Sequence, residues 1–179
     1  MLNQRDGMGL VLFDEKIRKS IPPRASASHA NIIMGALDNI HTGKDTQIRS
    51  TLDHMAERIK KRGLVILISD LLDDPDKVIR GLKHLRFGGN DVIVFQILDP
   101  DELEFPFEGA TKFHDPESAD ELMVMPSEVR ADYIQAIEEL VAKYDRDLKL
   151  VNIDYHLVDT SKPLDLSLMH YLSTRSRRG

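Results

Sequence analysis

The sequence contains no cysteine, and none of its apolar stretches approaches the roughly 20 residues that a membrane-spanning helix needs. The absence of cysteine excludes disulfides, thiol chemistry and zinc sites of the cysteine type. The first seven residues also lack the apolar region of a secretory signal. We therefore expect a protein without a membrane span that resides in the reducing environment of the cytoplasm.

The sequence also lacks an excess of positive charge, since its formal net charge is -6. Binding driven by nucleic-acid phosphates depends on clustered Lys and Arg, so we expect no nucleic-acid partner. One short basic run, Arg58 to Arg62, ends a predicted helix, where cations interact favourably with the helix dipole. A second forms a basic tail at residues 175–179, and we expect residues 1–174 to form one domain with a single core.

Motifs for nucleotide binding and hydrolysis are missing as well. The chain has no Gly-rich phosphate loop, no Gly-x-Ser-x-Gly elbow and no His-Glu-x-x-His pair. Its seven histidines are scattered, without an obvious helical spacing for metal ligands. We therefore expect no catalytic residues and no cofactor-binding residues, and we do not expect an enzyme.

The most informative feature that is present is a set of four apolar runs that each stop on an aspartate, namely Asp14, Asp70, Asp99 and Asp159. Such runs, separated by amphipathic stretches, are typical of parallel strands in an α/β sheet, whose ligands lie beyond the carboxyl ends of the strands. These aspartates either hold a hard cation through oxygen ligands or serve as ordinary turn and cap residues.

The order of predicted elements alternates between strands and helices. Apolar periodicity, prolines and glycines predict a strand at 9–14, an extended piece at 17–21 that Pro22 and Pro23 end, a helix at 28–40, a helix from Thr46, a strand at 64–69, a helix from Pro75, a strand at 92–98, a hairpin of 111–113 with 121–125, a long helix from Pro126, a strand at 155–158 and a terminal helix around 166–172. The fold class is therefore α/β, with a mainly parallel sheet flanked by helices and a small inserted β-hairpin.

Two residues stand out as candidate ligands. Asp99 precedes a proline and Asp159 ends a strand, so cap and turn roles account for both. Asp70 ends the most continuously apolar run and does not directly abut the next predicted helix, so capping alone does not explain it. The hydroxyl of Thr46 either caps the helix that it begins or coordinates a cation.

Three segments closely resemble a bacterial family, the domain of unknown function 58 family. They are residues 62–74, residues 94–109, which contain Asp-Pro-Asp-Glu-Leu-Glu-Phe-Pro-Phe, and residues 154–164. The resemblance implies a Rossmann-like fold of the von Willebrand factor A type and an association with a MoxR-type AAA+ ATPase. It also implies a metal-ion-dependent adhesion site, in which Thr46 and Asp70 match a threonine and an aspartate that help to bind Mg²⁺.

The chain departs from the family pattern at its start, because the family's first strand and its Asp-x-Ser-x-Ser motif would lie upstream of Met1. Thr46 and Asp70 are then an incomplete metal site, and hard cations in proteins bind about six oxygen ligands. The missing strand would lie between the strands at 9–14 and 64–69. We expect the chain to be marginal or aggregation-prone, or to pair those two strands directly.

The leading hypothesis is a non-enzymatic protein-interaction module of the von Willebrand A-like type that works with a MoxR-type ATPase and other proteins in their assembly or maturation. The alternative is a magnesium-dependent phosphoryl-transfer or phosphoacceptor domain that uses Asp70 with neighbouring acids. A third reading is a gene fragment without an independent role.

Overall fold

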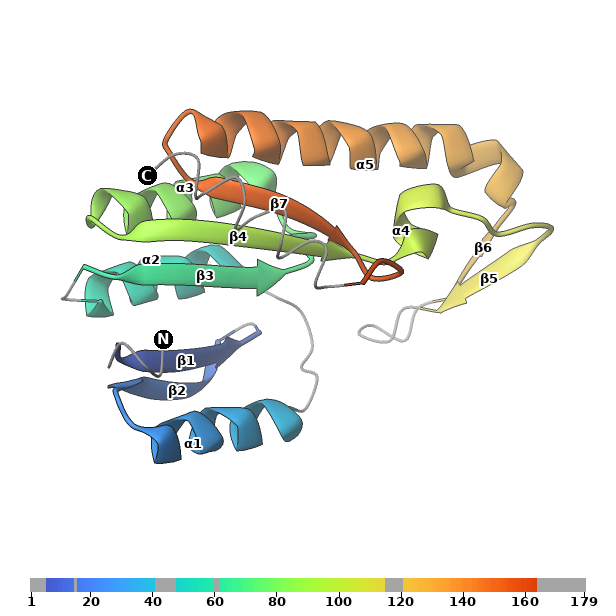
Figure 1. Cartoon of the computed structure of the whole chain (residues 1–179). Coiled ribbons are helices and arrows are strands. Elements are labelled where there is room, and N and C mark those ends of the chain that lie inside the picture. Colours follow the sequence, from blue (N-terminus) through green and yellow to red (C-terminus); the bar gives the residue numbers. More distant parts are fainter. Residues whose placement is uncertain (1–5, 15, 41–47, 60–61, 115–120, 164–179) are drawn as a thin grey trace.

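The structure is a computed structural model that describes residues 6–14, 16–40, 48–59, 62–114 and 121–163 (Figure 1). Its elements alternate in the way that the apolar pattern predicts. In chain order they are β1 (Met8–Phe13), β2 (Ile17–Arg24), α1 (Ala27–Asp38), α2 (Ile48–Arg58), β3 (Leu64–Ser69), α3 (Pro75–Phe87), β4 (Asp91–Leu98), α4 (Pro100–Glu104), β5 (Thr111–His114), β6 (Glu121–Val124), α5 (Pro126–Lys149) and β7 (Asp154–Asp159).

The centre of the fold is a parallel sheet with the strand order β3-β4-β7. In β4 six of the eight side chains are buried, as expected for a middle strand that is covered on both faces. The main core joins one face of this sheet to α2, α3 and α5. Its fully buried members include Leu52 of α2, Leu82 of α3, Val94 of β4 and Leu148 of α5. The prediction of a parallel sheet flanked by helices is confirmed.

Helices α2 and α3 approach each other closely at Gly81. A Cβ atom added to this glycine would lie 2.9 Å from the Cβ of Leu52, closer than carbon atoms pack without displacement. The substitution Gly81→Val is therefore expected to overpack the interface and lower the free energy of unfolding by about 1–3 kcal/mol, measured by urea denaturation. Gly35, inside α1, has no atom within 4 Å of its added Cβ. Equal destabilisation by Gly35→Val would contradict this explanation.

The N-terminal strands form a separate antiparallel pair, β1 with β2, and this corrects two expectations. The run that ends at Asp14 was predicted to join the parallel sheet, but β1 pairs only with β2 among the described strands. The prediction that Pro22 and Pro23 end the second strand is also wrong, because β2 continues to Arg24. Prolines fit there because the other edge of β2 has no described strand to receive a backbone donor.

The strands β7, β4, β3, β1 and β2 follow one another from top to bottom in Figure 1, and α1 lies beyond β2. Between β3 and β1 the hydrogen-bonded order is interrupted, since the two belong to different sheets. The expected direct pairing of these strands therefore does not form. Whether the chain is marginal or aggregation-prone stays a prediction.

The predicted hairpin is confirmed as β5 and β6, which pair antiparallel and extend away from the main sheet (Figure 1). An aromatic cluster joins this hairpin to α5: Phe105 packs at ring-centroid distances of 5.7 Å from Phe113 and 4.6 Å from Tyr133. Arg130 of α5 donates to the carbonyl oxygens of Phe105 and Phe107. The predicted terminal helix and the basic tail lie outside the described residues.

Candidate functional site

The carboxyl ends of β3, β4 and β7 lie at one edge of the parallel sheet, and Asp70, Asp99 and Asp159 stand there, as the apolar runs predict. Parallel pairing requires this, because neighbouring strands that run the same way end together. Their local surroundings differ, however. Each carboxylate is bound into a different turn or cap.

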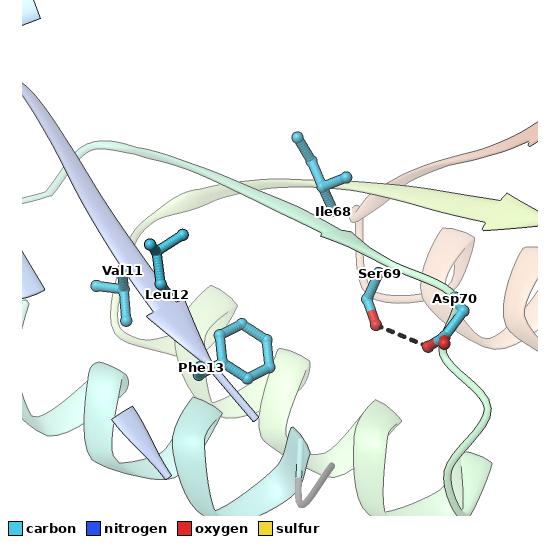
Figure 2. A pocket seen from close by; sticks show the side chains of 6 residues that line it. All are labelled: Val11, Leu12, Phe13, Ile68, Ser69 and Asp70. Atoms are coloured by element: carbon cyan, nitrogen blue, oxygen red, sulfur yellow. Dashed lines mark hydrogen bonds between the residues drawn. The ribbon is translucent and has the colours of Figure 1, made fainter. Parts of the chain in front are cut away.

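Asp70 begins the turn that follows β3, and its side chain is exposed. Its Oδ1 accepts a hydrogen bond from the Ser69 hydroxyl at 3.2 Å (Figure 2). The same oxygen accepts from the backbone N–H of Leu72 at 3.4 Å. The Ser69 hydroxyl in turn accepts from the N–H of Leu71 at 3.2 Å. Leu71 has φ 57°, in the left-handed region that is unfavourable for leucine, so the turn needs support from outside.

Three buried side chains supply that support from the core. Gln96 of β4 donates from Nε2 to the carbonyl oxygen of Asp70 at 2.8 Å, and its Oε1 accepts from the hydroxyl of Tyr155 at 2.6 Å. The hydroxyl of Tyr144 donates to the carbonyl oxygen of Leu71 at 3.1 Å. Burial raises the pKa of both tyrosines, so their hydroxyls remain protonated donors. The position of Asp70 is thereby fixed by its backbone.

Asp99 and Asp159 have the cap and turn roles that the sequence offered as the alternative to metal binding. Asp99 caps α4, and its Oδ2 accepts from the Thr160 hydroxyl at 2.7 Å. The backbone N–H of Asp101 is the largest cause that lowers the pKa of Asp99, followed by the Thr160 hydroxyl. Asp14 closes the β1–β2 turn, where an ion pair with Arg18 lowers its pKa.

The pKa of Asp159 is held at about 2, first by the hydroxyl of Ser161, then by Lys162 and the backbone N–H of Ser161. Because the folded pKa is depressed below the usual value of about 4, this carboxylate contributes stability above pH 4. That contribution is lost as the pH falls toward 2. We expect Ser161→Ala to raise the pKa of Asp159 in a carboxyl NMR titration. An unchanged titration would contradict the hydroxyl's role.

Two further acids of the same edge cap helices. Asp74 caps α3 through the N–H groups of Asp76 and Lys77. Asp73 accepts from the backbone N–H of Ile48, the first residue of α2, at 3.2 Å. This contact brings the start of α2 to the loop that follows Asp70. Thr46 itself lies outside the described residues, so its approach to Asp70 stays a prediction.

The described residues do not provide a complete ligand set for Mg²⁺. Among them, no three His, Asp, Glu or Cys side chains come close enough together to hold a metal ion. The expectation of acids gathered around one cation is therefore not met in that part of the chain, because Asp73, Asp74 and Asp99 each bind backbone N–H groups of helix starts. Asp70 remains the one predicted ligand whose position is described.

The same edge opens into a hollow of about 260 Å³ between β1 and β3. It is lined by Val11, Leu12 and Phe13 from β1 and by Ile68, Ser69 and Asp70 from the end of β3 (Figure 2). Sequence reasoning missed this hollow, and it also missed Gln96, Tyr144 and Tyr155. A glutamine inside an otherwise apolar run was the one available signal, since a buried amide needs partners.

Within the described residues no helix is long and apolar enough to span a bilayer. No curated protein matches the chain. Two solved structures share its fold. One is BatB from Bacteroides thetaiotaomicron, described as a conserved hypothetical protein, with a TM-score of 0.57 and 16% identity over 98% of this chain and 83% of that one. The other is an aerotolerance-related membrane protein from Bacteroides fragilis, with a TM-score of 0.51 and 18% identity over 87% and 73%.

A family match agrees with the resemblance seen in the three sequence segments. The family described as "Protein of unknown function DUF58" matches residues 1–142, most of the chain. This confirms the family itself, while the von Willebrand A type and the ATPase association stay predictions. The chain belongs to the DUF58 family.

Proposed function

We propose that this chain is a non-enzymatic protein-interaction module of the von Willebrand A-like type that acts with a MoxR-type AAA+ ATPase in the assembly or maturation of other proteins. The observation that carries this proposal is the uncovered strand β3. Its sequence, Leu-Val-Ile-Leu-Ile-Ser, is that of an interior strand. Nevertheless Leu64, Ile66 and Ile68 are 39%, 46% and 65% exposed.

Binding of a partner that covers these exposed side chains would be favourable, because it buries apolar surface. Full burial of an isoleucine side chain is worth about 1.5–3 kcal/mol, so burying the exposed parts of Ile66 and Ile68 contributes on the order of 2 kcal/mol. Helix α1 adds a second uncovered apolar surface, since Ile32 and Met34 are both exposed. Apolar surface of this kind is typical of binding surfaces rather than of chemistry.

The phosphoryl-transfer alternative needs a cationic side chain beside Asp70 to clamp a phosphate. The described hydrogen bonds of the Asp70 carboxylate come from Ser69 and Leu72, neither of which is cationic. No observation within the described part of the chain therefore favours that alternative, and we pursue the interaction module alone.

The direct test is binding to a purified MoxR-type ATPase, measured by biolayer interferometry with and without nucleotide. We expect a micromolar complex that Ile68→Lys weakens about tenfold, which corresponds to about 1.4 kcal/mol. Leu122→Lys is the matched control, because Leu122 lies on β6 and is 65% exposed, like Ile68. Absence of binding under both nucleotide conditions, or equal weakening by the two variants, would contradict the proposal.

We place the module in the bacterial cytoplasm, and a link to aerotolerance is part of the proposal because one solved neighbour carries that description. The same neighbour is described as a membrane protein. Cell fractionation followed by immunodetection tests the location. Recovery of the protein with membranes after washes at high salt would contradict the cytoplasmic assignment.

A further inference from the structure

We propose that the β5–β6 hairpin binds a basic, apolar segment of a second partner protein, which adds to β6 as a third, extended strand. The inference goes beyond the proposed function, because that function uses β3 and the hairpin extends away from the main sheet (Figure 1). The proposal concerns residues 121–129, which comprise β6 and the first turn of α5, and which we call the β6 surface.

The β6 surface exposes large apolar side chains on both faces of the hairpin. Leu122 and Met123 are 65% and 66% exposed, and Met125 and Val129 are 45% and 38% exposed. Successive residues of a strand point to opposite faces, so Leu122 and Met123 lie on different faces. Methionine is unbranched and adapts to partners of varied shape, which makes it common at binding surfaces. A partner that covers the β6 surface therefore has to contact both faces.

An extended segment meets this requirement better than a helix does. β6 pairs with β5 along one edge, and no described strand pairs with its other edge. The four residues of β6 include neither proline nor lysine, which often protect exposed strand edges. A strand added at that edge brings side chains to both faces of the hairpin, whereas a helix laid on the hairpin covers only one face. The exposed side chains therefore favour a strand as the occupant.

The charge of this region identifies the chemistry of the occupant. Residues 99–132 contain eleven acidic and two basic residues, whereas the rest of the chain contains 19 acidic and 22 basic residues. Eight of the eleven acids belong to the described residues. Both basic residues are already engaged: Lys112 pairs with Glu121 at 2.6 Å, and Arg130 donates to backbone carbonyl oxygens. The region therefore attracts a positively charged segment.

The acids of the β6 surface flank its apolar stretch. Glu121 begins β6 and Glu128 lies in the first turn of α5, and both are exposed. Between them stand the consecutive apolar residues Leu-Met-Val-Met. The complementary segment has basic residues at both ends and about four apolar residues between them, the length of β6. The same surface of a second copy is disfavoured as the occupant, because acids would then face acids.

The hairpin is held rigidly at its base. The rings of Phe105, Phe107 and Phe113 contact one another at centroid distances of 5.1, 5.1 and 5.7 Å. Arg130 joins this cluster to α5 by bonds to the carbonyl oxygens of Phe105 and Phe107. These two phenylalanines belong to the segment 94–109, for which the proposed function has no use. A preorganised hairpin loses little conformational entropy when a strand joins it.

The test uses a fluorescently labelled peptide, Arg-Lys-Val-Leu-Val-Leu-Lys-Arg, whose binding to the full chain is measured by fluorescence anisotropy. We expect micromolar affinity, which Met123→Lys weakens about tenfold because it replaces an apolar contact with a like charge. Ile68→Lys is the matched control, since Ile68 lies on β3 and is 65% exposed. It adds the same charge and is expected to leave the affinity for the peptide unchanged.

Two control peptides separate strand pairing from attraction between charges. The reordered peptide Val-Arg-Leu-Lys-Val-Lys-Leu-Arg has the same composition, but its charges no longer flank an apolar stretch. A second peptide keeps the original order and is N-methylated at its four central amides, which removes their backbone donors. Each is expected to bind about tenfold more weakly than the original peptide. Glu128→Gln is expected to weaken binding about threefold, and Glu138→Gln, also exposed on α5, is expected to have no effect.

Four results would overturn the inference: no binding of the peptide, equal weakening by Ile68→Lys and Met123→Lys, undiminished binding of either control peptide, or loss of self-association of the chain in Met123→Lys. The last result would assign the β6 surface to a second copy. The ATPase measurement is independent, because Leu122→Lys is expected to weaken the peptide about tenfold and to leave ATPase binding unchanged. ATPase binding without peptide binding removes only this inference, whereas peptide binding without ATPase binding removes only the partner proposed for β3.

Discussion

Replacing Gln96 with leucine is expected to lower the free energy of unfolding by about 2–3 kcal/mol, measured by urea denaturation. Gln96 is fully buried and bonds both the carbonyl oxygen of Asp70 and the hydroxyl of Tyr155. Leucine has a similar volume but bonds neither, so the buried hydroxyl of Tyr155 and the part-buried carbonyl oxygen of Asp70 lose their partner. The desolvation of such groups is what makes the substitution costly.

A double-mutant cycle separates this hydrogen-bond effect from a change in packing. Tyr155→Phe alone leaves the Oε1 of Gln96 without its 2.6 Å donor, whereas in the Gln96→Leu background it removes a hydroxyl that is already unpaired. The second substitution is therefore expected to be less destabilising in that background, by about 1 kcal/mol. If the losses of unfolding free energy from the two substitutions simply added, the hydrogen bond between Gln96 and Tyr155 would not contribute to stability.

The network also connects the core to the candidate site. Gln96 and Tyr144 hold the carbonyl oxygens of Asp70 and Leu71, so they set where β3 ends and where the Asp70 side chain stands. In the proposed interaction both residues would act by positioning Asp70, since their side chains are buried and would not touch a partner directly.

The substitution Ile68→Lys is expected to convert a self-associating chain into a predominantly monomeric one. Ile68 is 65% exposed on β3, whose edge toward β1 has no described strand paired to it, and apolar edges without charge favour association between chains. An added lysine places a charge on that edge. Light scattering coupled to size-exclusion chromatography over a series of protein concentrations measures the change.

Leu122→Lys provides the control for this prediction as well, because it adds the same charge at an equally exposed leucine on β6. It is expected to leave the association of the chain unchanged. If the unmodified chain were monomeric at every concentration and unfolded cooperatively, the edge of β3 toward β1 would not cause association between chains. An equal decrease of self-association in both variants would point to net charge as the cause.

Elements defined by local chemistry could be predicted from the sequence. The bounds of β3 agree with the predicted 64–69, because the run is continuous and Gly63 precedes it. The start of α3 follows from Asp74 and Pro75, a cap and a first-turn proline. The β5–β6 hairpin was visible in two short segments around a polar turn.

Features that depend on distant partners could not be predicted. Pro22 and Pro23 predicted the end of the second strand, yet β2 is an outer strand among the described ones and accommodates both prolines. Asp73 caps α2 from 25 residues away, a contact without any local pattern. Gln96 binds Asp70 and Tyr155 only because β3, β4 and β7 are neighbours. Asp70 was correctly placed at the carboxyl edge, whereas its role as a metal ligand stays a prediction because Thr46 lies outside the described residues.

The central claim is that β3 is an interior-type strand whose edge toward β1 has no partner among the described strands. Amide hydrogen exchange followed residue by residue by NMR tests this most directly in the free chain. The account predicts slow exchange along β4 and fast exchange at those β3 amides that point away from β4. Uniformly slow exchange along β3, equal to that of β4, would show that the edge is already paired and would contradict the account.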